Sequence, residues 1–215
     1  MTGDDAAASR ERQESLVAER RRALGDDHPE THAAMLDLAE LLWREGRLKA
    51  ARQWEERVVA ARRAALGEDH PETLKAVGKL AATLGAQGGL GAAQSLQERV
   101  VAGMRAAFGD QARDTLRALN NLAGTLAAAG DFDAARGLIE GVVADAARSL
   151  GAEDSDTLAA MGNLAGVLWQ MGERDDAYWL QQQVTETQLR LRGDRDPAAQ
   201  TAVAALAMMQ RGFEF

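Results

Sequence analysis

The chain has 215 residues, and 33 acidic residues against 25 basic ones give it a formal net charge of −8. This balance argues against a general nucleic-acid or anionic-membrane surface, because both need a basic footprint. The absence of cysteine excludes disulfides, thiolate metal sites and thiol nucleophiles. No apolar run approaches the ~20 residues of a membrane span, and the N-terminus lacks signal-peptide features. We therefore expect a cytoplasmic protein with no nucleic-acid or membrane partner.

The N-terminal segment divides into a tail and a helix. Residues 1–8 are small and polar without periodic apolar positions, so we expect a disordered tail there. A charged helix is predicted from Arg10 to Leu24, with Leu16 and Val17 in register with apolar residues of a later helix. This segment, residues 9–24, is interpreted as a half-repeat that caps the array.

One motif recurs along the chain at a spacing of 42 residues: Leu66-Gly67-Glu68-Asp69-His70-Pro71-Glu72-Thr73-Leu74. An earlier copy begins at Leu24, and fainter copies begin at Phe108, Leu150 and Gly193. Self-similarity at such a period is typical of a solenoid. We predict an all-α fold of about ten helices. Its single solenoid spans 9–212, with repeats starting near 25, 67, 109 and 151, a C-terminal half-repeat at 193–212 and a tail at 213–215.

Each full repeat is predicted to hold two helices. Asp27 and Asp69 are expected to cap the first helix, and Glu30 and Glu72 three residues later complete a capping-box pattern. The third and fourth copies lack the His-Pro pair. The first helix is expected to end at a glycine that takes the left-handed conformation; these glycines are Gly46, Gly88, Gly130 and Gly172.

Apolar residues at helical spacing predict the core. The first helices carry Met35, Leu38, Ala39, Leu42; Val77, Leu80, Ala81, Leu84; Leu119, Leu122, Ala123, Leu126; and Met161, Leu164, Ala165, Leu168. The second helices carry small residues where the helices cross (Ala51, Ala93, Ala135, Ala177) and larger ones beyond (Trp54, Leu96, Leu138, Leu180, Val58, Val100, Val142, Val184).

The series Leu38-Ala39, Leu42, Gly46 and Ala51, repeated in phase, resembles the tetratricopeptide repeat (TPR). The 42-residue period and the recurring motif resemble its kinesin-light-chain-like subfamily, which is common in bacterial proteins. The resemblance implies a right-handed superhelical solenoid of antiparallel helix pairs. It also implies a non-enzymatic scaffold without cofactors, whose first helices line a concave groove that binds a peptide or protein.

Residues between the core positions of the first helices are the candidate ligand-binding set, here called the predicted groove residues. They are Asp37, Glu40, Trp43, Arg44, Lys75, Lys79, Arg117, Asn120, Asn121, Asn163, Trp169 and Gln170. The basic members predict a ligand with acidic residues or a free carboxylate, and the asparagines could hydrogen-bond the amides of an extended peptide.

Five glycines interrupt the first helices at groove positions: Gly78, Gly85, Gly124, Gly162 and Gly166. Each costs roughly 1 kcal/mol relative to alanine in a helix, so a compensating reason is expected. Either the glycines let a ligand backbone approach, or they permit close helix crossing while the neighbouring charges form a solvated face.

Two features of the sequence bear on alternatives to groove binding. The last predicted helix is apolar over a wide arc that includes Val203, Leu206, Met208 and Met209, which favours a regulatory or oligomerisation module, such as a homodimer through this helix. His28 and His32 resemble a metal pair, but no third ligand is in register, so we expect no metal site and no catalytic site.

Overall fold

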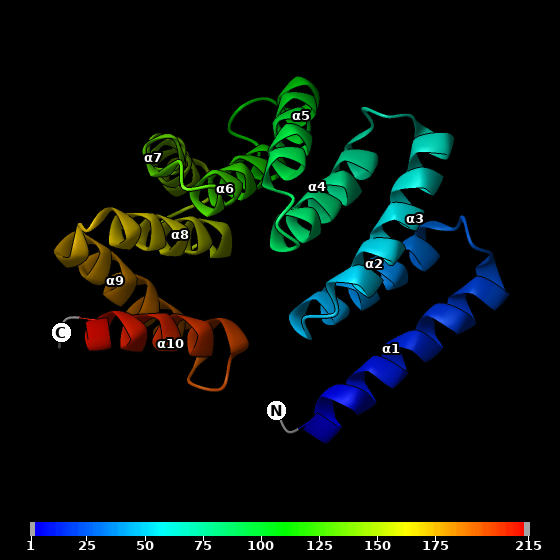
Figure 1. The fold of residues 1–215 in the computed structure, drawn as a ribbon, viewed down its shortest axis with the longest axis horizontal. Helices are drawn as coiled ribbons and strands as arrows, with labels where there is room; N and C mark the ends of the chain where they lie inside the picture. The colour runs from blue at the N-terminus through cyan, green and yellow to red at the C-terminus, as the bar shows by residue number, and fades with distance from the viewer. Residues whose placement is uncertain (1–2, 213–215) are drawn as a thin grey trace. The chain divides into compact units, whose positions relative to one another are not determined.

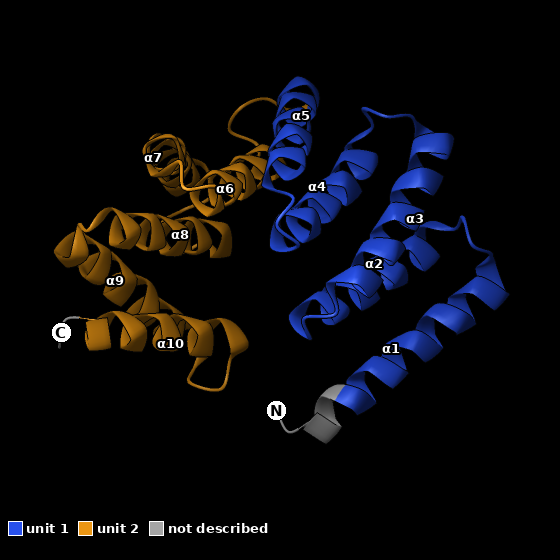
Figure 2. Cartoon of the chain, viewed as in Figure 1, with its two compact units in different colours: residues 1–107 blue, residues 108–215 orange. Residues whose placement is uncertain are grey.

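The computed structural model describes residues 3–212, and within that range it is made of helices and turns alone. The chain divides into two compact units, Met1–Ala107 and Phe108–Phe215, each treated by itself below (Figure 2). Unit 1 holds α1 (Gly3–Leu24), α2 (Pro29–Arg44), α3 (Leu48–Leu66), α4 (Pro71–Ala86) and α5 (Leu90–Phe108, whose last residue opens unit 2). Unit 2 holds α6 (Arg113–Ala128), α7 (Phe132–Ser149), α8 (Ser155–Met171), α9 (Arg174–Arg192) and α10 (Pro197–Gly212).

The helices alternate as first and second members of antiparallel pairs, which confirms the predicted fold class (Figure 1). α2, α4, α6, α8 and α10 are first helices, and α1, α3, α5, α7 and α9 are second helices. The N-terminal boundary differs from the expectation, because α1 begins at Gly3 and includes residues 3–8. Alanine, the strongest helix former, occupies positions 7 and 8 and extends the helix. The predicted tail at 213–215 lies outside the described residues.

The first helices are capped one residue later than predicted. His28 and His70, not Asp27 and Asp69, are the N-caps of α2 and α4, and their Nδ1 atoms accept hydrogen bonds from the backbone N–H two residues on at 3.2 Å. The proline that follows each histidine opens the helix, which leaves the preceding aspartate outside it. Asp154 occupies the same position before α8 and accepts from the Asp156 N–H at 2.9 Å.

A buried threonine joins each first helix to the end of the helix before it. Thr31, Thr73, Thr115 and Thr157 are all 0% exposed. Each Oγ1 donates to the carbonyl of the glycine six residues earlier, at 2.7–2.8 Å. The fifth copy has Ala199 at this position, so α10 begins without the bond.

The small residues predicted for the core are buried, whereas several larger ones are only half-buried. The crossing alanines Ala51, Ala93, Ala135 and Ala177 are 0% exposed, and Val58, Val100, Val142 and Val184 are buried. Gly46 and Gly172 end their first helices with φ of +74° and +87°, as predicted. Leu80 and Leu122 of the first-helix stripes are only half-buried, as are the larger second-helix residues Trp54, Leu96, Leu138 and Leu180.

One core position of the second helices is polar in three of its four copies. It is occupied by Glu55, Gln97, Ile139 and Gln181. Gln97 Nε2 donates to the carbonyl of Gly78 at 3.2 Å, and Gln181 Nε2 donates to that of Ala202 at 3.1 Å. Glu55 is 3% exposed; its Oε1 accepts from Thr83 Oγ1 at 2.9 Å, and its Oε2 has no partner among the described residues.

The third repeat offers a test of the cap. Ala112 has the same extended backbone (φ −68°, ψ 143°) as Asp154 (φ −64°, ψ 145°) but no side-chain acceptor. We expect Ala112→Asn to raise the free energy of unfolding by about 0.5–2 kcal/mol, because it adds the missing cap without adding charge. Urea unfolding measures the gain, and His70→Ala should lower stability by a similar amount. An unchanged midpoint for Ala112→Asn would contradict this account of the helix start.

A second test concerns Glu55. Burial raises the pKa of its carboxyl, against the opposing effects of the Thr83 hydrogen bond and the Lys79 charge. Because the folded pKa lies above the unfolded value of 4.5, the stability that the protonated carboxyl provides is complete below that pH. It is lost as the pH rises through the folded pKa.

Glu55→Gln, which installs the residue found at positions 97 and 181, should therefore stabilise the protein at pH 7 by about 1–3 kcal/mol. The register of Gln97 and Gln181 places the carbonyls of Leu36 and Ala76 as acceptors for the new amide. Urea unfolding at pH 7 and pH 4 measures the difference, which should shrink at the lower pH. Equal gains at both pH values would exclude a buried charge as the cause.

Candidate functional site

The predicted groove residues of unit 1 form charge pairs between and along the first helices. Lys79 Nζ of α4 lies 3.0 Å from Glu40 Oε2 of α2, and Arg44 Nη2 lies 2.5 Å from Glu40 Oε1. The hydrogen bond from Lys79 is the main cause that holds the pKa of Glu40 below its usual value, against desolvation. Lys75 Nζ pairs with Glu72 at 3.1 Å. Asp37 and Trp43 are exposed on the same helix, α2.

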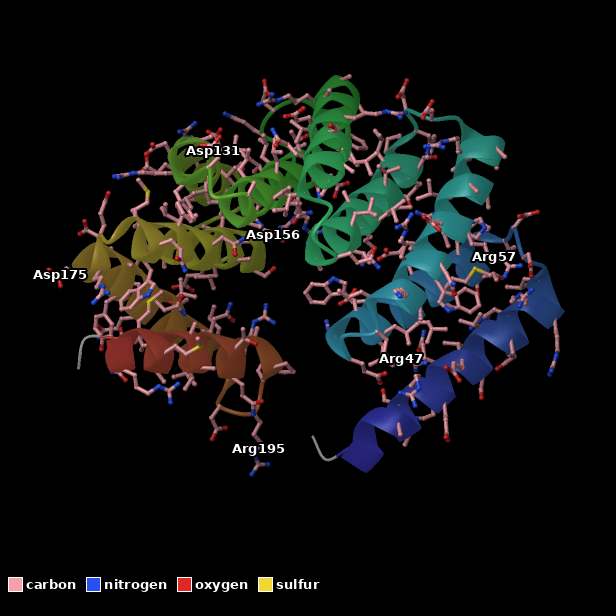
Figure 3. The ribbon with its side chains drawn as sticks, in the orientation of Figure 1. Arg47, Arg57, Asp131, Asp156, Asp175 and Arg195 are labelled. Atoms are coloured by element: carbon pink, nitrogen blue, oxygen red, sulfur yellow. The ribbon has the colours of Figure 1, made fainter. Side chains whose placement is uncertain are left out.

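Unit 2 has an acidic partner for Arg117 that the sequence analysis did not include. Asp156, at the start of α8 (labelled in Figure 3), accepts from Arg117 Nε of α6 at 2.8 Å and also pairs with Arg113. Arg113 pairs with Asp154 at 2.8 Å, and these hydrogen bonds lower the pKa of the Asp154 carboxyl. Glu72 in unit 1 and Asp156 in unit 2 neutralise neighbouring cations. The surface of the first helices in each unit is therefore less basic than the sequence indicated.

The asparagines of α6 and α8 form the next contact. Asn163 Nδ2 donates to Asn120 Oδ1 at 2.9 Å, although the two residues are 43 positions apart in the chain. This bond joins neighbouring first helices and uses one donor and one acceptor of the pair. Asn121 is exposed one position along α6. Asn120 and Asn163 of the predicted groove residues therefore lie together.

Beside this pair is a hollow of about 440 Å³ between α6, α7 and α8, here called the α6–α8 hollow. Three of the five helix-interior glycines line it, together with Asn163 and Gln170 from the predicted set. Its full lining is Ala123, Gly124, Ala127, Phe132, Ile139, Gly162, Asn163, Gly166, Val167 and Gln170. Phe132 and Ile139 were not predicted because they belong to a second helix.

Close helix packing explains the helix-interior glycines of unit 1, but not all of those in unit 2. A Cβ atom on Gly85 would lie 3.5 Å from Ala93, and one on Gly78 would lie 3.9 Å from Val100, so both glycines lie at the α4–α5 contact. Gly124 and Gly166 of the α6–α8 hollow have no atom within 4 Å of such a Cβ. Close helix packing therefore does not account for these two.

Trp169 lies against the C-terminal end of α10. The Arg174 guanidinium is 5.3 Å from the Trp169 ring centroid, and Arg174 Nη1 donates to the Gly212 carbonyl at 3.0 Å. A Cβ on Gly212 would be 2.5 Å from the indole. The ring therefore holds the last turn of α10 in place, while its remaining surface is half-exposed.

α10 departs from the other first helices on the face that carries leucines in those helices, and one of its residues there, Gln210, donates to the Tyr178 hydroxyl of α9 at 2.9 Å. Gln200 stands where α4, α6 and α8 have a buried leucine, and Gln210 stands where α2 and α8 have one. Val203 between them is 42% exposed, and Met208 is 66% exposed. Two glutamines make this face more polar than the apolar arc suggested.

The histidine pair has structural tasks. His28 caps α2, and His32 is 4% exposed, with burial lowering its pKa. The described residues contain no cluster of three or more His, Asp or Glu side chains that could hold a metal ion. In the same part of the chain, no helix is both long and apolar enough to span a membrane.

Comparison with known proteins identifies the repeat. The sequence profile of the tetratricopeptide repeat matches residues 3–64, 33–106 and 114–189. The chain belongs to the tetratricopeptide repeat family. No curated protein matches it significantly. Its bacterial origin and cytoplasmic location remain predictions.

Solved structures show the same TPR fold. The chain is 30% identical to a variant of the nearly identical TPR-like repeats of a Podosopora anserina protein provisionally described as a kinesin light chain, with a TM-score of 0.64 over 86% of this chain and 87% of that one. A second structure of those repeats is 29% identical, with a TM-score of 0.62 over 89% and 90%. BtubC (BKLC) from P. vanneervenii shares the fold at 18% identity, with a TM-score of 0.69 over 100% and 85%.

The glycines of this TPR array predict opposite effects of one substitution. Gly166→Ala should raise the free energy of unfolding by roughly 1 kcal/mol, because the helix improves and the Cβ meets open space. Gly103→Ala in α5 should lower it, because the new Cβ would overlap Cδ1 of the fully buried Leu74. Such overpacking costs about 1–3 kcal/mol. Urea unfolding compares the two, and a destabilising Gly166→Ala would restore a packing role for Gly166.

Proposed function

We propose that this chain is a non-enzymatic interaction module that binds an extended peptide segment along its first helices, with the α6–α8 hollow as the main contact in unit 2. TPR folds generally mediate protein–protein interaction. The observation that carries the proposal is the open space over Gly124 and Gly166. Two glycines that weaken a helix without serving its packing are accounted for by a ligand that comes close to the backbone.

The asparagines supply the polar contacts for such a peptide. The bond between Asn163 and Asn120 leaves the carbonyl oxygen of Asn163 and the amino group of Asn120 outside that interaction. Asn121 and Gln170 add two further exposed amides. A side-chain amide presents both a donor and an acceptor, which matches the alternating N–H and C=O groups of an extended backbone.

We propose that the charged side chains determine which peptides bind preferentially and contribute little to the affinity. Arg44, Lys75, Lys79 and Arg117 each have a carboxylate partner, so an acidic ligand would exchange one ion pair for another. Exposed pairs of this kind contribute about 0–1 kcal/mol. An acidic peptide or a free carboxylate is therefore expected to bind with a salt-dependent preference and modest gain in affinity.

The alternative function is self-association through α10. The exposed Val203 and Met208 favour it, and the polar Gln200 and Gln210 on the same helix weaken it. Light scattering over a range of concentrations tests it, since a strict monomer at high concentration would eliminate an α10 dimer.

The test of peptide binding fills the hollow without touching the core. Peptides are first selected on the unaltered protein from a random display library, and their Kd values are measured by fluorescence anisotropy. Gly124→Leu with Gly166→Leu should weaken them by about tenfold or more, because the side chains occupy the space proposed for the ligand. The fold should remain intact by circular dichroism.

The matched control is Gly137→Leu with Gly141→Leu in α7. Like Gly124 and Gly166, these two helical glycines have no atom within 4 Å of an added Cβ, but they do not line that hollow. The proposal fails if both double variants bind the selected peptides alike, or if the library yields no binder.

A further inference from the structure

A histidine replaces leucine at one core position of the first repeat. His32 of α2 is 4% exposed, and its copies in α4, α6 and α8 are the buried Leu74, Leu116 and Leu158. The copy in α10 is Gln200, which is exposed. No second helix follows α10 within the described residues. Wherever a second helix does follow, the position is an apolar one, except at His32.

That position lies against the second helix of the same repeat. A Cβ added to Gly103 of α5 would overlap Cδ1 of Leu74, so this leucine is in close contact with α5. Ala61 stands 42 residues before Gly103, and the register therefore places His32 against Ala61 of α3. A titratable ring occupies an interface between α2 and α3 that leucine fills in the other repeats.

The surroundings of the His32 ring favour the neutral imidazole over the charged one. The ring forms a hydrogen bond with the backbone of Asp26, but its Nε2 has no partner among the described residues. Both ring nitrogens carry a proton in the charged form, so Nε2 would become a donor without an acceptor. A buried group that is both charged and unpaired is more costly than a neutral one.

Arg62 of α3 brings a second positive charge to the same interface. Its side chain is 11% exposed; Nη1 lies 3.3 Å from Glu72 Oε2 of α4 and donates to the Glu72 carbonyl at 2.7 Å. From α1, Arg20 pairs with Glu30 of α2 at 2.8 Å. Burial is the main cause that lowers the pKa of His32, and the charge of Arg62 is the next. Two cations repel each other more strongly in a buried contact than on the surface.

The carboxylates near His32 offset these effects only in part. Asp27 and Asp26, in the turn before α2, act to raise its pKa. Asp27 is exposed, and Asp26 already pairs with Arg21 of α1 at 2.6 Å and with Arg57 of α3 at 2.9 Å. The folded pKa therefore lies below the unfolded value of 6.5. Stability is complete above that pH and is lost as the pH falls through 6.5 toward the folded pKa.

We propose that the first repeat is an acid-sensitive element, in which protonation of His32 loosens the α2–α3 contact and lowers the free energy at which α1 and α2 open. These are the first two helices of unit 1, and a repeat can open locally because it contacts only its neighbours. α2 carries Glu40, Trp43 and Arg44 of the predicted groove residues, so mild acid removes part of that surface. The test uses no peptide, and its failure would leave the proposed function standing.

Hydrogen exchange followed by mass spectrometry measures the effect at pH 7.5 and pH 5.5, corrected for the intrinsic exchange rate at each pH. Protection of the α2 amides should fall by up to about tenfold at pH 5.5, one unit below the unfolded pKa of 6.5. Amides of α8, which has Leu158 at the same position, are the internal control and should lose less. A fall in α2 no larger than that in α8 would overturn the proposal.

Substitutions at His32 assign the effect to its ring. His32→Leu installs the residue of the next three repeats, and His32→Gln keeps a polar side chain that does not titrate. Both should remove the fall in α2 protection, because all other titrating groups, including Glu55, are unchanged. The control His70→Asn keeps a cap acceptor for α4 and should retain the fall. Equal falls in the unaltered protein and in both His32 variants, each folded by circular dichroism, would contradict the assignment.

Discussion

The arrangement of the first helices depends on one repeated hydrogen bond, from a buried threonine to the carbonyl of the glycine that ends the preceding helix. The bond is short, is excluded from water and recurs in four copies. A net contribution of about 0.5–1.5 kcal/mol for each is modest, but an unpaired buried hydroxyl would cost more. The interaction therefore favours one geometry for the turn.

That geometry brings side chains of successive first helices together within each unit. Glu40 meets Lys79 in unit 1, while Arg117 meets Asp156 and Asn120 meets Asn163 in unit 2. The polar surface of the first helices is thus built from pairs rather than from single side chains. A ligand on such a surface competes with contacts that already exist, which favours selectivity over strong charge attraction.

The repeat period predicted the helices and the core well, because apolar spacing and helix-ending glycines are local signals. It erred by one residue at the caps, since His28 and His70 can each act as an acceptor that the sequence pattern assigned to aspartate. It also missed the role of Asp156, because apolar spacing carries no information about which charged side chains pair between helices. Register fixes which residues are near, but not which side chains pair.

The last interhelical turn is the exception to this scheme, with Ala199 where the others have threonine. Asp196 still caps α10, but the carbonyl of Gly193 receives no hydroxyl from that position. Hydrogen exchange of the backbone amides should therefore report a lower opening free energy for α10 than for α8. Transient release of that helix would uncover Gln181 and Gln188 while α6 and α8 stay folded. Opening of α10 therefore offers a route for exchange between solvent and these two glutamines, which are otherwise buried.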